Sequence, residues 1–139
     1  MKKSISIVIG LLSFICLFVL VTCEVNTNGG FSLSGTLTKS GVDGELAYLK
    51  LVASGAAPDT QAIYFAVSTP FSAGTATYSV TGIDEGQYTG YAFIDVNGNA
   101  TGDESSLPDS GDFITDEGAD VNMTGDLTLD INESDWSQL

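Results

Sequence analysis

The 139-residue sequence contains no histidine, and only four basic residues stand against 18 acidic ones. Its two cysteines, Cys16 and Cys23, lie within and directly after an apolar N-terminal run. Without histidine or further cysteines, neither a disulfide framework nor a Cys/His zinc site can be built. The lack of histidine also removes the usual base for a serine or threonine nucleophile, and no lysine stands out as a replacement. We therefore expect a protein that is not an enzyme.

Positive charge is scarce along the whole chain, and the formal net charge is −14. Lys2 and Lys3 lie in a segment that we expect to be removed, which leaves only Lys39 and Lys50 as basic residues. A surface this acidic repels the phosphates of nucleic acids and anionic lipid headgroups, so we expect no nucleic-acid partner. It is compatible with divalent cations, with basic partners or simply with high solubility.

The sequence also lacks any segment with a sustained helical period, and short segments of alternating polar and apolar residues take its place. These segments cover residues 31–38, 45–53, 61–69, 75–83, 87–95 and 121–131. The last one is a single long strand, or two strands with a break near Gly125. Residues 91–94 are apolar on both faces, which is typical of a strand covered on both sides. We predict one all-β sandwich of about seven strands over residues 31–131, followed by a polar tail at 132–139.

Residues 1–22 have the layout of a secretory signal. A basic start precedes the apolar run from Ile5 to Val21, and Cys23 follows at the boundary. Cys23 and the polar, glycine-rich residues up to Gly30 are typical of a short flexible tether. The chain is thus predicted to carry its folded domain outside the cytoplasm.

This N-terminus resembles the signal of bacterial lipoproteins, in which the boundary cysteine receives acyl chains such as palmitate. Leu20 and Val21 match the lipobox, whereas Thr22 departs from the usual small residue. The resemblance implies lipidation of Cys23 and a membrane partner in the cell envelope. Glu24, in place of an aspartate after the cysteine, favours the outer membrane. The alternative is an incidental cysteine beside an uncleaved membrane anchor.

Three segments resemble the carboxypeptidase regulatory-like, or transthyretin-like (prealbumin-like), domains. They are Phe31–Leu37 (FSLSGTL), Ala47–Leu51 (AYLKL) and Tyr78–Tyr88 (YSVTGIDEGQY). The resemblance implies a β-sandwich that serves as an accessory module, either a spacer or a binder of carbohydrate or protein.

Oxygen-bearing side chains recur at alternate positions where the strand 87–95 ends. They are Asp95, Asn97, Asn99 and Asp103. This spacing matches positions 1, 3, 5 and 9 of an EF-hand-type calcium loop, although position 6 is Ala100 and position 12 is Ser106. Asp109 or Asp112 could supply the missing carboxylate, and Thr101 a backbone carbonyl. We predict a structural Ca²⁺ site; the alternative is a solvated Asn/Asp/Gly turn.

Three functions are compatible with these features. The first is a non-enzymatic envelope lipoprotein whose sandwich has a structural or binding role. The second is a carbohydrate-binding accessory module of a polysaccharide uptake or degradation system, with Tyr48, Tyr64 and Trp136 exposed for stacking on sugar rings. The third is a glycoside hydrolase, which requires two carboxyl groups facing each other in a concave pocket.

Overall fold

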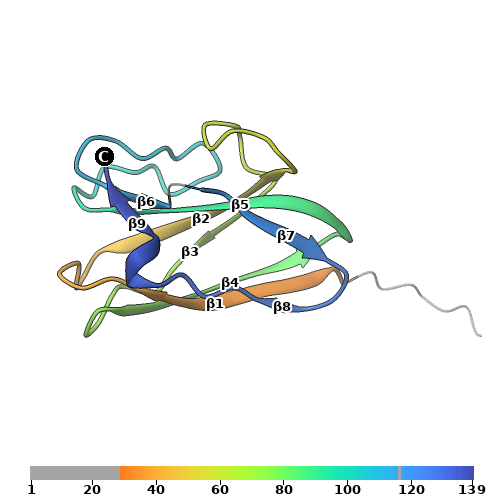
Figure 1. Ribbon diagram of the computed structural model, residues 1–139, viewed down its shortest axis with the longest axis horizontal. Coiled ribbons are helices and arrows are strands. Elements are labelled where there is room, and N and C mark those ends of the chain that lie inside the picture. Colours follow the sequence, from red (N-terminus) through yellow and green to blue (C-terminus); the bar gives the residue numbers. More distant parts are fainter. Residues whose placement is uncertain (1–28, 116) are drawn as a thin grey trace, which may run out of the picture.

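The computed structural model describes residues 29–115 and 117–139, and this part of the chain is an all-β sandwich of two sheets (Figure 1). The predicted signal segment and Cys23 lie outside the described residues. No helix within the described ranges is long and apolar enough to cross a membrane. The elements are β1 (Phe31–Thr38), β2 (Leu46–Ala53), β3 (Tyr64–Val67), β4 (Thr75–Ile83), β5 (Gly86–Asp95), β6 (Phe113–Thr115), β7 (Ala119–Met123), β8 (Leu127–Thr128), the 3₁₀ turn η1 (Glu133–Asp135) and β9 (Trp136–Gln138).

The first sheet has the strand order β4-β1-β8, in which β1 is antiparallel to β4 and parallel to β8. The second sheet has the order β3-β2-β5-β6-β9, and β7 pairs with the first half of β5. In Figure 1 the first sheet is the lower layer, and β2, β5, β6 and β7 form the upper layer. The strand β5 is therefore central, with neighbours on both sides along its length.

The hydrophobic core lies between the two sheets and is built from the inward residues of each alternating strand. Its fully or nearly fully buried side chains include Leu33, Leu37, Leu49, Leu51, Tyr78, Ile83, Ala92, Ile94, Val121 and Met123. Burying such side chains is the main favourable contribution to folding. The alternation found in the sequence is thus the cause of the two-layer architecture.

Gly35 marks a place where two backbones come unusually close. A Cβ atom at this position would lie 1.9 Å from the carbonyl oxygen of Leu129. The same oxygen accepts a 2.6 Å hydrogen bond from the hydroxyl of Tyr78, which reaches it across the core side of β1. Only glycine fits here, because any side chain would push the segment after β8 away from β1.

The sandwich and most of its strands were predicted correctly. The bounds of β1 and β4 agree with the predicted ranges 31–38 and 75–83. The predicted segment 121–131 does break around Gly125, and its two halves join different sheets. The sequence did not predict β6 or β9, and residues 132–139 form η1 and a sheet strand, not a free polar tail.

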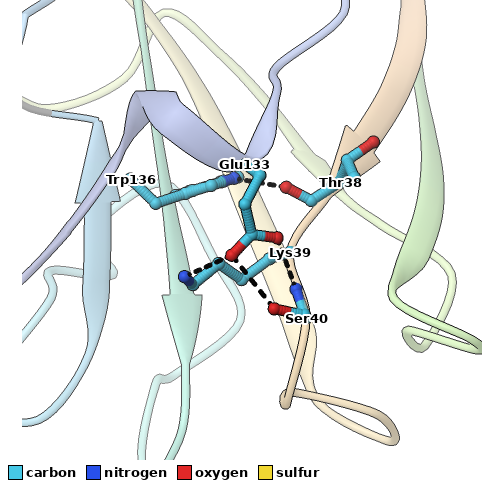
Figure 2. Close-up of polar contacts among 5 residues, drawn as sticks. All are labelled: Thr38, Lys39, Ser40, Glu133 and Trp136. Atoms are coloured by element: carbon cyan, nitrogen blue, oxygen red, sulfur yellow. Dashed lines mark hydrogen bonds and ion pairs between the residues drawn. The ribbon is translucent and has the colours of Figure 1, made fainter.

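The C-terminal segment is fastened to the turn after β1 by a group of polar contacts, which we call the C-terminal clamp (Figure 2). The Glu133 carboxylate accepts hydrogen bonds from Lys39 Nζ at 2.8 Å and from the Ser40 backbone N–H at 2.6 Å. The indole N–H of Trp136, which is buried, donates to the carbonyl of Thr38 at 3.0 Å. The hydrogen bonds from Lys39 and Ser40 hold the pKa of Glu133 below its ordinary value.

Candidate functional site

Except for Asp95 at the end of β5, the predicted calcium ligands lie in the loop between β5 and β6, residues 96–112, which we call the acidic loop. This loop and the loop after β2 both lie over the outer face of the second sheet, above β2 and β5 in Figure 1. The buried Lys50 side chain joins the two loops, since its Nζ donates to the carbonyls of Pro58 and Ser106 at 3.2 and 3.3 Å. The acidic loop is therefore attached to the sheet near its middle, at Ser106, as well as at its ends.

Asp95, the last residue of β5, organises the start of the acidic loop. Its carboxylate is only 4% exposed and accepts hydrogen bonds from the backbone N–H groups of Gly98 (2.8 Å), Asn99 (3.2 Å) and Ala100 (2.9 Å). These bonds wrap the backbone around the carboxylate, as an aspartate at the start of a turn commonly does. About three of the four lone-pair positions of this carboxylate are thus taken by the backbone of the loop itself.

Asn97, Asn99 and Asp109 are brought together at the exposed side of the loop. The side-chain amide of Asn97 donates to one Asp109 oxygen at 2.8 Å, and that of Asn99 donates to the other at 2.5 Å. Rotating each amide would turn its oxygen toward the place that its nitrogen now occupies, because the two ends of an amide are nearly equal in shape. This rotation would place two amide oxygens beside the Asp109 carboxylate, which are oxygen types that calcium prefers, at the loss of the 3.2 Å hydrogen bond that the Asn97 oxygen accepts from the Asn99 backbone N–H.

Asp112 closes the base of the acidic loop. It is 1% exposed, and its two oxygens accept hydrogen bonds from the backbone N–H groups of Val96 and Asp109, each at 3.0 Å. Asp112 therefore folds back toward the end of β5, as Asp109 does. Its role in the described contacts is to hold the two ends of the loop together.

Asp103 and Thr101 form a separate turn with local partners. The Asp103 carboxylate accepts from the backbone N–H of Ser105 at 2.9 Å and from the Thr101 hydroxyl at 3.0 Å. The hydrogen bonds from Ser105, together with that from Thr101, hold the pKa of Asp103 below its ordinary value. The contacts thus divide the predicted ligands into one group around Asp95 and Asp109 and another around Asp103.

A metal site made of acidic side chains alone does not occur in the described part of the chain. Over residues 29–115 and 117–139, no group of three or more His, Cys, Asp or Glu side chains is arranged to hold a metal ion. The mixed group of Asn97, Asn99 and Asp109 contains a single acidic side chain and so falls outside that description.

The aromatic side chains proposed for sugar stacking are mostly buried. Tyr48 is 5% exposed, and its ring stacks on Phe93 at 5.0 Å and on Phe65 at 5.7 Å between centroids. Trp136 is 7% exposed. The prediction that these two are exposed was wrong, because Tyr48 packs against neighbouring aromatic rings of the sheet and Trp136 belongs to the hydrophobic core. Tyr64 is half-buried and contacts Tyr88 edge-on at 5.6 Å.

Lys50 is the residue whose importance the sequence did not reveal. The alternation of β2 places it on the outer face of the second sheet, where it is 2% exposed. Burial lowers the pKa of its ammonium group. One signal in the sequence indicated a covered surface. Tyr48 and Val52, which share the outer face of β2 with Lys50, are both apolar or aromatic.

A cavity of about 390 Å³ is lined by residues of both β2 and the segment after β8. Three acidic residues, Glu117, Asp130 and Asp135, are among those that line it. Asp130 accepts a hydrogen bond from the Thr36 backbone at 2.8 Å, and Asp135 accepts one from the Asn132 backbone at 2.7 Å. Both of these carboxylates thus have a structural partner.

Comparison of the chain with protein-family models, with curated proteins and with solved structures gives no match. The function must therefore be argued from the contacts described above.

Proposed function

We propose that the chain is a non-enzymatic lipoprotein of the cell envelope, anchored through Cys23, most simply in the outer membrane. Its sandwich serves as a structural or binding module for a protein or carbohydrate at the cell surface. The layout of the N-terminal residues supports the anchor, and the two-sheet sandwich is compatible with the resemblance to carboxypeptidase regulatory-like or transthyretin-like accessory domains.

The observation that carries this proposal is the position of the acidic loop relative to the start of β1. Phe31, where β1 begins, pairs with Ile83 at the end of β4, beside the turn into β5. From this turn β5 runs ten residues to Asp95. At about 3.4 Å per residue, the acidic loop begins about 30 Å from the tether. A lipid anchor before β1 would therefore hold the acidic loop away from the membrane, where a partner can reach it.

We further propose that the acidic loop holds Ca²⁺ through Asn97, Asn99, Asp109 and Asp95. Calcium suits amide and carboxylate oxygens in a flexible loop better than magnesium, which requires strict octahedral geometry and retains its water. The ion would offset the repulsion among the carboxylates and fasten the exposed part of the loop. An affinity typical of extracellular modules, with a Kd of about 10⁻⁴–10⁻³ M, is expected.

Thermal unfolding of the chain from Glu24 onward, in chelator and in calcium, tests the metal proposal. At ten times Kd, calcium should stabilise the fold by about 1.4 kcal/mol, because it binds only the folded state. Asp109→Asn should abolish this increase, whereas Asp59→Asn, which removes an exposed charge from the other loop, should leave it intact. A midpoint that is the same in both buffers would refute the calcium site.

The anchor is tested separately by mass spectrometry of the protein extracted from membranes. We expect a mature N-terminus at Cys23 that carries acyl chains. The Cys23→Ser variant should carry none. A mature N-terminus at any other residue would rule out the lipoprotein while leaving the calcium proposal untouched.

A further inference from the structure

We propose that a cavity on the outer face of the second sheet binds a small carboxylate with an apolar body, and that the Lys50 ammonium group pairs with the ligand's carboxylate. The cavity has a volume of about 260 Å³, close to the lower end of the range for ligand pockets. Its floor is formed by strand residues and its walls by the acidic loop and the loop after β2. The residues that matter for the argument are Lys50, Asp59, Tyr91, Phe93, Leu107 and Ile114.

Lys50 is the observation that points to a charged ligand. Its side chain is 2% exposed, and its two hydrogen-bond acceptors are the neutral backbone carbonyls of Pro58 and Ser106. An ammonium group has three donors, so one donor remains. Among the described residues, the ion pair found joins Lys39 to Glu133, and Asp59 is the acidic residue whose charge acts on Lys50. A buried cation is costly unless it is paired at contact distance, and a ligand carboxylate would supply both that contact and the third acceptor.

The walls of the cavity define the rest of the ligand. Tyr91, Phe93 and Ile114 present mainly apolar surface, and Leu107 lies at the rim with 48% of its surface exposed. Apolar walls around one charged group are the usual composition of a small-molecule site. The cavity therefore suits a small aromatic or branched aliphatic carboxylate.

Two electrostatic effects oppose the binding of such an anionic ligand and limit its affinity. Asp59 is exposed at the cavity. Its negative charge favours the protonated form of Lys50, as a bound carboxylate would, so it competes with the ligand. The chain as a whole has a formal net charge of −14, which repels anions at long range. We expect a Kd of about 1 mM for a ligand of ten heavy atoms.

The test is a titration of 4-fluorobenzoate and of neutral 4-fluorobenzamide, followed by fluorine NMR on the full chain in phospholipid nanodiscs. Empty nanodiscs give the background. The wild type should bind the carboxylate about tenfold more tightly than the amide. Lys50→Met, which keeps the length of the side chain and removes its charge, should abolish this preference. Asp59→Asn should tighten binding of the carboxylate alone, because it removes a competing negative charge.

A second pair of variants covers the case in which Lys50→Met does not fold. Leu107→Asp and Leu107→Asn are nearly identical in size and lie at the exposed rim, so both should fold. The aspartate should weaken 4-fluorobenzoate binding about threefold relative to the asparagine and leave 4-fluorobenzamide unaffected. Equal binding of the two probes to the wild type, or no saturable binding at 20 times the expected Kd of about 1 mM, would overturn the proposal and leave Lys50 as a link between the two loops.

Discussion

On the outer face of the first sheet, hydroxyl side chains pair across β1 and β4 and lie at the surface. The pairs are Ser34 with Ser79, Thr36 with Thr77 and Thr38 with Thr75. On the outer face of the second sheet, Tyr48, Lys50 and Phe93 are each at most 5% exposed, beneath the acidic loop and the loop after β2. The first sheet thus has one buried face and the second has two. This difference explains why β5 is apolar on both faces whereas β1 and β4 alternate.

Acidic side chains serve both sheets as acceptors for backbone N–H groups. At the edge of β1, Asp126 and Asp130 accept from the backbones of Ser32 and Thr36, each at 2.8 Å. Over the second sheet, Asp95 and Asp112 do the same for the acidic loop. These four aspartates therefore stabilise the backbone locally without a basic partner in the hydrogen bonds described.

The largest predicted effect comes from removing an outer-face side chain of the second sheet. Phe93→Ala should lower the free energy of unfolding by about 3–5 kcal/mol, because the ring is 2% exposed and stacks on Tyr48. Ser79→Ala, the matched change on the outer face of the first sheet, should change it by less than about 0.5 kcal/mol. Urea unfolding measures both. Similar costs for the two variants would mean that the loops do not cover the second sheet.

A somewhat smaller effect is expected where the first sheet is tightly packed on its inner side. Gly35→Ala should cost about 3 kcal/mol, since its Cβ would overlap the Leu129 carbonyl. Gly125→Ala provides the control, because a Cβ there meets no atom within 4 Å. Thermal unfolding of the two variants measures both costs. A large cost for Gly35→Ala alone would show that the first sheet is sensitive on its inner side, although its outer face tolerates substitution. A tolerated alanine at position 35 would disprove the close approach of the two backbones.

The smallest predicted effect depends on pH and concerns the C-terminal clamp. The pKa of Glu133 is lowered on folding, so its stabilising contribution is present above its ordinary pKa of about 4.3 and is lost as the pH falls through the lower folded value. Glu133→Gln should therefore lower the melting temperature at pH 7 but not at about pH 2. Glu104→Gln, at an exposed position, is the control. If the melting temperatures of Glu133→Gln and the wild type differed as much at about pH 2 as at pH 7, the charge of Glu133 would be excluded as the cause.

The sequence predicted the elements whose pattern is local. The alternation of β1 and β4 and the doubly apolar β5 were sufficient to predict a sandwich, because each pattern follows from which faces are buried. The burial of Lys50 could not be predicted, because alternation assigns a residue to a face but does not show what covers that face. Its partner Ser106 is 56 residues away in the sequence. The strands β6 and β9 have three residues each, which is too few to show a period. They pair with each other although they are more than 20 residues apart in the sequence.

The acidic loop was predictable to a similar degree. Asp95, Asn97 and Asn99 were recognised from their spacing, which is a local property. The return of Asp109 to the two asparagines, and of Asp112 to Val96, depends on how the intervening residues fold over the second sheet. No local pattern encodes that path, so the sequence left open which aspartate returns.

Amide hydrogen exchange of the full chain, in calcium and in chelator, tests most directly whether the acidic loop is a built element that calcium completes. The amides of Val96, Gly98, Ala100 and Asp109 donate to buried aspartates, so we predict protection in both buffers and slower exchange across residues 96–112 in calcium. Exchange in β1 and β4 should slow by no more than the global stabilisation that calcium gives the fold. Unprotected exchange of the four amides, at the same rate in calcium and in chelator, would contradict the account.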